Sequence, residues 1–314
     1  MTFNTNDLSF GYCTNVHAGL TLSDAQANLD RIAVRVRQQV APQGRLRVGL
    51  WLPERAARQL SQADEVTRFG AWLAERRLKP YTLNGFPQGD FHQAVVKHAV
   101  YEPTWLEASR AEYTCLLADI LSKLLPDEQS GSISTLPLGW PHRRWQKEDY
   151  AQAAANLRQV AHHLHAVAEQ SGHEIVLAIE PEPGCVLNTG PELIEFFERF
   201  LFDGASDIVR RHITVCHDIC HSAVMFESQS ETLQAYAQHG IRVGKLQVSS
   251  AVEVPWQEVA GAEERRQAMA AQLLAFDEPR YLHQTTRFEQ ATGRVELVEG
   301  FAVVLPLLED RFPA

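Results

Sequence analysis

The sequence predicts an α/β protein of the (β/α)8 barrel type, and two observations carry that prediction. Eight short, apolar, β-branched segments recur along the 314 residues, and longer segments with helical periodicity separate them. The spacing between these strands averages about 40 residues, the length of one strand with its helical crossover. An open, doubly wound sheet is the alternative, but no predicted strand is followed by the glycine-rich GxGxxG or GxxxxGK loops of nucleotide-binding sheets.

The elements follow one another in a regular order. The predicted strands lie at 8–15, 46–52, 79–86, 132–140, 174–181, 212–220, 242–250 and 279–286. Amphipathic stretches between them predict helices at 22–40, 54–77, 147–170, 191–203 and 256–275. No linker rich in proline, glycine or serine interrupts this order, so residues 1–314 are predicted to form a single domain.

The widest gap lies between the third and fourth predicted strands and contains a long loop at 84–104 (NGFPQGDFHQAVVKHAVYEPT). Loops longer than about 15 residues without secondary structure are usually functional. We therefore expect this loop to act as a lid over a site.

The composition restricts the class of protein. Hydrophobic residues make up 45% of the chain and charged residues 22%, which is typical of a globular protein. The formal net charge of −10 argues against a nucleic-acid partner, because such a partner is bound through its phosphate groups. No apolar run approaches the roughly 18 residues of a membrane span, and the first residues do not resemble a signal peptide. The five cysteines contain no CxxC pair and indicate reduced thiols. We expect a cytoplasmic protein whose partner is a small-molecule metabolite, with no nucleic acid and no membrane span. Both a monomer and a homo-oligomer are compatible with the sequence.

Polar residues that end apolar strands are the candidates for chemistry, because function lies at the carboxyl ends of the strands in a parallel barrel. Glu180, Asp218, Gln247 and His283 belong to four successive predicted strands. Oxygen and imidazole ligands of this mix suit Mn²⁺, Mg²⁺, Co²⁺, Fe²⁺ or Zn²⁺. The sequence therefore predicts one divalent metal ion bound by these four residues. The alternative is that each is an isolated polar group that only makes hydrogen bonds.

A second set of polar and aromatic residues lies at other strand ends and in the 84–104 loop, where side chains could contact a substrate. The predicted substrate-binding residues are Asn15, His17, Asn84, Phe86, His92, Trp140, Glu182 and Lys245. For the aromatic residues among them, packing in the core is the alternative.

Three strings carry a resemblance to a known family: LAIEPEPG (177–184), CHDICHSAV (216–224) and KLQVSS (245–250). They resemble the xylose isomerase-like TIM barrels of the sugar phosphate isomerase/epimerase superfamily. The resemblance implies that Glu180, Asp218 and Gln247 are metal ligands and that His221 is a substrate-binding or second-metal histidine. The family usually has a glutamate in strand eight, where this chain offers His283.

Further strings are similar to one branch of that superfamily, the metabolite-traffic protein EboE. They are YCTNVHAG (12–19), NGFPQGDFH (84–92), VKHAVYEPTW (96–105), STLPLGW (134–140) and EPEPGCVL (180–187). That branch is associated with the export of a small natural-product precursor.

Together these features predict a metal-dependent isomerase or epimerase of a small polyhydroxylated or carbonyl metabolite. Glu180, His221 and His283 are the predicted catalytic residues, since proton abstraction from carbon needs an acid/base pair. The alternative is a non-catalytic metabolite-binding or traffic protein on the same barrel, which the missing strand-eight glutamate favours. An abasic-site endonuclease on this fold would need a basic groove, and the net charge of −10 argues against it.

Overall fold

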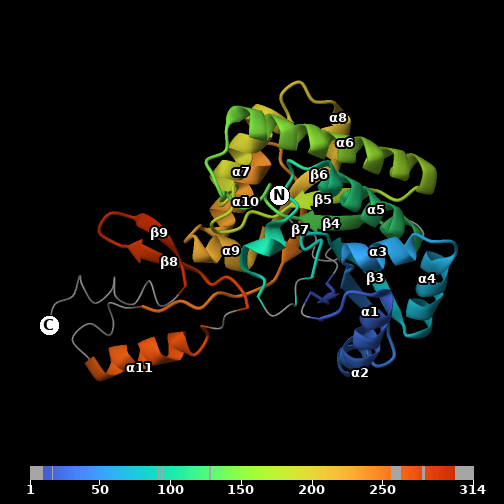
Figure 1. The fold of residues 1–314 in the computed structure, drawn as a ribbon, viewed down its shortest axis with the longest axis horizontal. Coiled ribbons are helices and arrows are strands. Elements are labelled where there is room, and N and C mark those ends of the chain that lie inside the picture. The colour runs from blue at the N-terminus through green and yellow to red at the C-terminus, as the bar shows by residue number, and fades with distance from the viewer. Residues whose placement is uncertain are drawn as a thin grey trace.

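The computed structural model describes residues 10–15, 17–90, 92, 95–126, 129–255, 263–277 and 280–300. Seven of its strands form one parallel sheet, and neighbours in the sheet follow the order of the chain (Figure 1). This confirms the predicted α/β class and its succession of parallel strands. The strands are β1 (Tyr12–Cys13), β2 (Leu46–Trp51), β3 (Leu78–Asn84), β4 (Gly131–Thr135), β5 (Ile175–Ile179), β6 (Ile213–Asp218) and β7 (Val243–Gln247).

The sheet is curled, as in a barrel, and the sequence of its central strands explains why it is buried. Every residue of β4, β5 and β6 is buried, and β5 (IVLAI) is a continuous apolar run of the kind that can be covered on both faces. On the inner face, the ammonium group of Lys245 on β7 donates a hydrogen bond to the Ser134 hydroxyl of β4, at 2.9 Å. Side chains from strands three places apart therefore meet inside the curl.

Helices connect the strands and begin at recognisable caps. Thr21 and Thr189 each cap a helix in a reciprocal arrangement with an acid three residues later, which satisfies free backbone amides. No helix among the described residues is long and apolar enough to cross a membrane. The helices are α1 (Leu22–Asn28), α2 (Val34–Val40), α3 (Glu54–Leu60), α4 (Glu65–Glu75), α5 (Ala108–Leu124), α6 (Lys147–Ser171), α7 (Gly190–Phe196), α8 (Asp207–His212), α9 (Ile219–Val224), α10 (Gln229–Gln238) and α11 (Glu263–Leu274).

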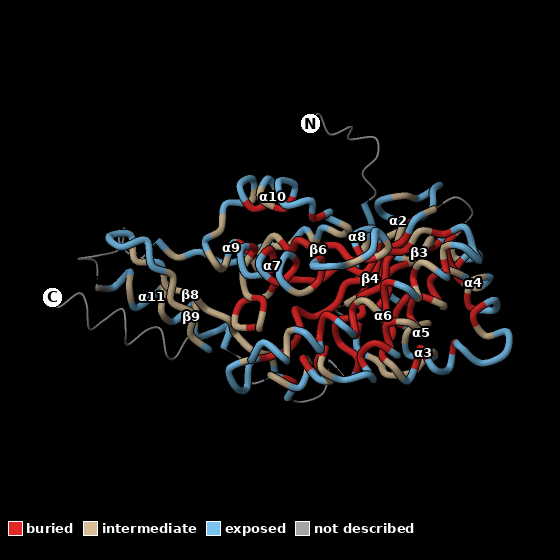
Figure 2. Tube along the Cα trace, turned by 90° about the horizontal axis from the view of Figure 1, so that it is seen from above, coloured by how far each residue is buried: buried red, intermediate tan, exposed pale blue. Residues whose placement is uncertain are grey.

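The hydrophobic core lies between the sheet and the helices that pack on it. Figure 2 shows that buried residues gather in this body, whereas α11 and a hairpin to one side of it are mostly half-buried or exposed. α5 and α6 contribute the largest buried helix faces. The predicted helix 256–275 is observed from Glu263 onwards, and residues 256–262 lie outside the described part of the chain.

The predicted eighth parallel strand at 279–286 is wrong. In the described part of the chain, β8 (Gln284–Glu289) pairs with β9 (Arg294–Glu299) in a separate antiparallel hairpin, with Gln284 opposite Glu299. The sequence QTTRFE has one large apolar residue, so it cannot be buried on both faces as a barrel strand must be. The hairpin instead packs against the end of α9, where Thr286 donates to the Val224 carbonyl and Phe288 stacks on Phe226.

The 84–104 loop is anchored at both ends by one buried side chain. Arg110 of α5 donates to the carbonyl of Pro103 at 2.8 Å, and to those of Gly85 and Phe86 at 3.1 and 3.0 Å. Arg110 is fully buried, and burial lowers the pKa of its guanidinium to about 10. The loop ends are thus fixed to the body through a buried cation.

We expect Arg110→Met to lower the free energy of unfolding by about 3 kcal/mol, because three carbonyls, two of them on buried residues, would lose their donor. Urea denaturation measures this loss. Arg158→Met is the matched control: Arg158 also donates to three carbonyls, but it is only half-buried, so water can replace it. Equal losses in both variants would contradict the role of burial.

Candidate active site

Two carboxylates and one amide meet where three neighbouring strands end. Glu180 follows β5, Asp218 ends β6 and Gln247 ends β7. The amide nitrogen Nε2 of Gln247 donates to Glu180 Oε1 at 2.7 Å and to Asp218 Oδ2 at 2.8 Å. Glu180 is only 5% exposed and Asp218 only 8%. The structure therefore brings together three of the four residues predicted to bind metal.

Asp218 has further hydrogen bonds that favour its ionised form. Its Oδ1 accepts from the backbone amide of Cys220 at 2.9 Å and from the hydroxyl of Ser249 at 2.5 Å. Burial raises the pKa of Asp218, but the proximity of His221 and these hydrogen bonds outweigh burial and lower the pKa overall. Asp218 is thus a carboxylate at neutral pH.

Glu180 behaves differently because fewer donors face it. Burial raises the pKa of Glu180 to about 7, and the charges of Asp218 and Glu182 act in the same direction, against the opposing effect of His221 and Lys245. A carboxyl group with such a pKa can take up and release a proton near neutral pH.

The raised pKa predicts how stability depends on pH. The ordinary pKa of a glutamate is 4.5, whereas that of folded Glu180 is about 7, so between these values the unfolded chain releases a proton that the folded chain keeps. This group should therefore remove up to about 3 kcal/mol of stability as the pH rises from 4.5 to 7.

Urea unfolding of the metal-free protein at about pH 5 and about pH 7.5 measures this effect. Glu180→Gln cannot titrate and is the control, so wild type should lose stability relative to this variant as the pH rises. Parallel pH dependences of the two proteins would show that the pKa of Glu180 is not raised.

His221 stands beside the two acids at the first turn of α9. Its Nδ1 donates to the Pro181 carbonyl at 3.0 Å and lies 3.6 Å from Glu180 Oε1. Because Nδ1 carries the proton, Nε2 is the unprotonated nitrogen of the neutral ring. Burial lowers the pKa of His221, but the carboxylates of Glu182, Glu180 and Asp218 outweigh burial and raise it overall.

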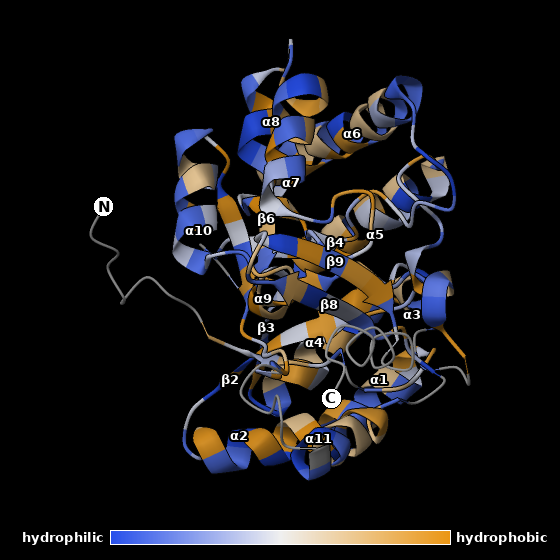
Figure 3. Cartoon of the chain, turned by 90° about the vertical axis from the view of Figure 1, so that its left-hand side faces the viewer, coloured by the Kyte–Doolittle hydropathy of each residue, from blue (hydrophilic) through white to orange (hydrophobic). Residues whose placement is uncertain are grey.

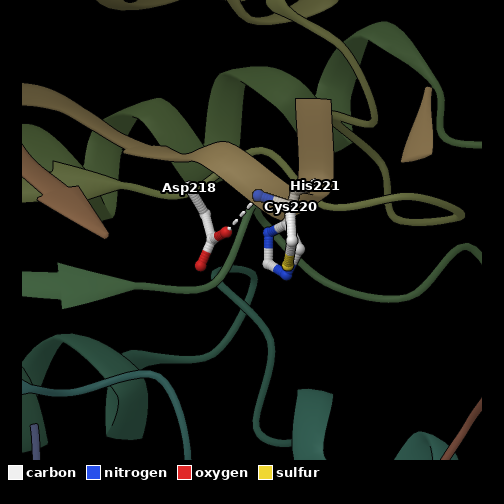
Figure 4. Close-up of side chains that lie close together, drawn as sticks. All are labelled: Asp218, Cys220 and His221. Atoms are coloured by element: carbon white, nitrogen blue, oxygen red, sulfur yellow. Dashed lines mark hydrogen bonds between the residues drawn. The ribbon is translucent and has the colours of Figure 1, made fainter. Parts of the chain in front are cut away.

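The thiol of Cys220 lies close to Asp218 and His221. One ligand atom each from Asp218, Cys220 and His221 lies within 4.8 Å of the other two (Figure 4). Among the residues that the structure describes, this is the one group of three histidine, cysteine or acidic side chains with such spacing.

The opposite inner wall is polar and was only partly predicted. Lys245 reaches Ser134, whose hydroxyl donates in turn to the Asn84 side-chain carbonyl at 3.2 Å. That carbonyl also accepts from the Phe86 backbone amide at 3.0 Å. Asn84 and Lys245 therefore lie at the predicted place, linked through a serine that nothing in the sequence singles out.

Three segments meet over the site through Glu182. Its Oε1 accepts from the Tyr101 hydroxyl at 2.9 Å and from Gln284 Nε2 at 2.7 Å. Tyr101 ends a short 3-10 helix (Lys97–Tyr101) of the 84–104 loop, and Gln284 begins β8. In Figure 3 the hairpin accordingly lies in front of the sheet. Glu182, whose role in substrate binding stays a prediction, joins the loop, the end of β5 and the hairpin.

Aromatic side chains pack beneath this junction. The Tyr101 ring centre lies 5.1 Å from that of Trp140 and 5.7 Å from that of Phe86, and Trp140 lies 4.5 Å from the His98 ring. Trp140 and Phe86 are 9% and 7% exposed. Both predicted substrate-binding aromatics are thus buried in packing beneath the loop.

We expect Gln284→Ala to loosen the hairpin, because the Glu182 carboxylate and the Tyr101 hydroxyl each lose a donor. A loss of about 1 kcal/mol corresponds to a roughly fivefold faster amide hydrogen exchange in β8 and β9. Gln290→Ala, in the exposed turn of the same hairpin, is the control and should leave exchange unchanged. Unchanged exchange in Gln284→Ala would mean that other contacts hold the hairpin.

Asn15, His17 and His92 form a separate group near β1. His92 Nε2 donates to the Asn15 carbonyl at 3.0 Å, and its Nδ1 accepts from the Tyr281 hydroxyl at 3.1 Å. His17 bonds to the Tyr12 hydroxyl at 3.0 Å, and burial, with Arg31 and His92, lowers its pKa. These residues connect the start of the chain to the loop and to the segment before the hairpin.

His283 is not brought to the expected group. Its Nδ1 lies 3.5 Å from Asp277 Oδ1, and it is absent from the cluster of potential ligands described above. The cause is the altered path of the chain, because β8 pairs with β9 rather than extending the parallel sheet. The neighbouring Gln284 reaches the site instead.

The residues present suit a divalent cation. Glu180 and Asp218 are buried acids that share one neutral amide donor, and a cation would compensate their charge better than an amide does. Carboxylate, imidazole and amide groups are also the donor types of such sites.

The fold and the site define an α/β protein with a curled parallel sheet and a buried acidic site at the carboxyl ends of its strands. No protein-family model and no curated protein matches the chain.

Similar solved structures include an L-ribulose 3-epimerase, at 15% identity and a TM-score of 0.49, covering 87% of this chain and 79% of that one. A 3-keto-D-glucoside 4-epimerase from E. coli has 12% identity and a TM-score of 0.47, with 95% and 97% covered. A xylose isomerase-like TIM barrel protein from Mycobacterium smegmatis, in complex with magnesium, has 10% identity and a TM-score of 0.48, with 98% and 89% covered. At these values the likeness assigns no activity to this chain.

Proposed function

We propose that this protein is a divalent-metal-dependent isomerase or epimerase of a small polyhydroxylated or carbonyl metabolite. The observation that carries the proposal is the pair of buried carboxylates, Glu180 and Asp218, that share the Gln247 amide. Without metal, burial raises the pKa of Glu180 to about 7 whereas Asp218 is ionised, and a bound cation would favour the ionised form of both groups.

Each side chain has a role in this reaction. Glu180, Asp218 and Gln247 would hold the ion, which supplies polarisation of a substrate carbonyl or hydroxyl oxygen. A carboxylate has two oxygens, so Glu180 can also accept a proton from the carbon beside the carbonyl and return it. His221 would stand beside the ion, and the Lys245 ammonium inside the curl stabilises the negative charge that develops on the substrate oxygen.

A specific observation favours a second candidate, a binding or handover protein. Proton return on the opposite face of the carbon needs a second acid/base group. Glu182 is engaged with Tyr101 and Gln284, and His283 lies beside Asp277. With both groups engaged elsewhere, the same site would hold a ligand without converting it to a product.

Solvent-deuterium exchange tests the two candidates. The protein is incubated in deuterated water with a panel of sugars and sugar phosphates, and nuclear magnetic resonance follows the carbon-bound protons. The isomerase predicts deuterium at the carbon next to the carbonyl. A panel member that raises the thermal midpoint of unfolding but never exchanges would support the binding protein instead.

A further inference from the structure

We infer that the site selects a thiophilic divalent cation, Zn²⁺, Co²⁺ or Fe²⁺, because the Cys220 thiolate is one of its ligands. This inference rests on the metal site of the proposed function and narrows the ion that it takes. The observation behind it is the grouping of ligand atoms from Asp218, Cys220 and His221 within 4.8 Å of one another (Figure 4).

The turn that carries these three residues is held in place by hydrogen bonds. Asp218 caps α9 by accepting from the Cys220 backbone amide, at 2.9 Å. The same amide lies 3.0 Å from the Ser249 hydroxyl, which itself donates to Asp218. His221 is fixed through its Nδ1 to the Pro181 carbonyl, so the unprotonated Nε2 is the ring atom available as a ligand.

The chemistry of the donors then decides the ion. Thiolate and imidazole are ligands of Zn²⁺ and of neighbouring first-row transition metals, whereas Mg²⁺ prefers a shell made of oxygen atoms. As the sulfur–metal bond forms, the thiol proton leaves to solvent. Cys220 is half-buried and can be reached by an ion, whereas Cys216 is fully buried within β6.

Cobalt spectroscopy tests the inference without any assay of activity. Metal-free protein is titrated with Co²⁺ while absorption is recorded. Visible bands report that the ion is bound, and a near-ultraviolet charge-transfer band reports a cobalt–thiolate bond. Wild type should show both. Cys220→Ser should keep the visible bands and lose the charge-transfer band, whereas Cys115→Ser, a half-buried thiol on α5, should keep both.

The outcomes separate this inference from the proposed function. Visible bands without a charge-transfer band in wild type would overturn the thiolate ligand and leave the metal site standing. A charge-transfer band that survives in Cys220→Ser would likewise overturn the role of Cys220. No bands at all would overturn the metal site itself.

Affinity provides an independent measurement. Removing a residue that only hydrogen-bonds to a metal ligand lowers metal affinity by roughly 10–100-fold. Removing a direct ligand should therefore weaken Zn²⁺ binding by about 100-fold or more. Chelator competition measures this loss for Cys220→Ser and should show little change for Mg²⁺. An unchanged Zn²⁺ affinity would count against the inference.

Discussion

Glu180→Gln should slow deuterium exchange into the cognate ligand by about 10²–10⁴, the usual cost of removing a general base. Glutamine keeps the size and the hydrogen-bonding capacity of the side chain but cannot accept the proton. Glu180 is the expected acceptor because one of its two carboxylate oxygens can take the proton while the other faces the ion. The rate of signal loss at the exchanging carbon, followed by nuclear magnetic resonance, measures the effect.

Glu182→Gln is the matched control for this experiment. Glu182 lies two residues away, but its carboxylate accepts from Tyr101 and Gln284, so its replacement should disturb the loop junction more than the proton transfer. If Glu182→Gln stops the exchange and Glu180→Gln does not, the assignment of the proton acceptor is wrong.

Asp218→Ala should abolish metal binding. Purified wild-type protein should contain about one divalent ion per chain and the variant almost none, because a buried carboxylate ligand is lost. Elemental analysis after dialysis measures the content. His283→Ala is the control, since its ring lies beside Asp277, and it should keep the metal. Full retention of metal by Asp218→Ala would remove that residue from the ligand set.

The sequence predicted most of the sheet, because its signal there is local. Continuous apolar runs such as 175–179 (IVLAI) are typical of a strand buried on both faces. The helix α5 has no such signal, because buried residues lie around most of its surface and form no stripe. The pairing of β8 was predicted wrongly, because the sequence of a short strand does not determine which strand it pairs with.

The candidate site, too, could be predicted only where the sequence signal is local. Glu180, Asp218 and Gln247 were predicted because each ends a strand, and parallel strands bring their ends together. Ser249 and Tyr101 were missed because their importance comes from hydrogen bonds across 31 and 81 residues of chain. No periodicity in the sequence encodes such contacts, which only the folded arrangement creates.

The hairpin lies over the strand ends and outside the parallel sheet. Ligand preference and chemistry therefore depend on different parts of the chain. The groups proposed to hold metal and move protons lie at the ends of strands β5 to β7 and in the first turn of α9, whereas residues 280–300 reach this site through Gln284. Changes in residues 280–300 can alter ligand preference without altering the reactive groups, because surface segments accept substitutions more readily than buried strands. Ligand preference and chemistry can therefore evolve independently here, and a library confined to residues 280–300 is a direct way to redirect the protein.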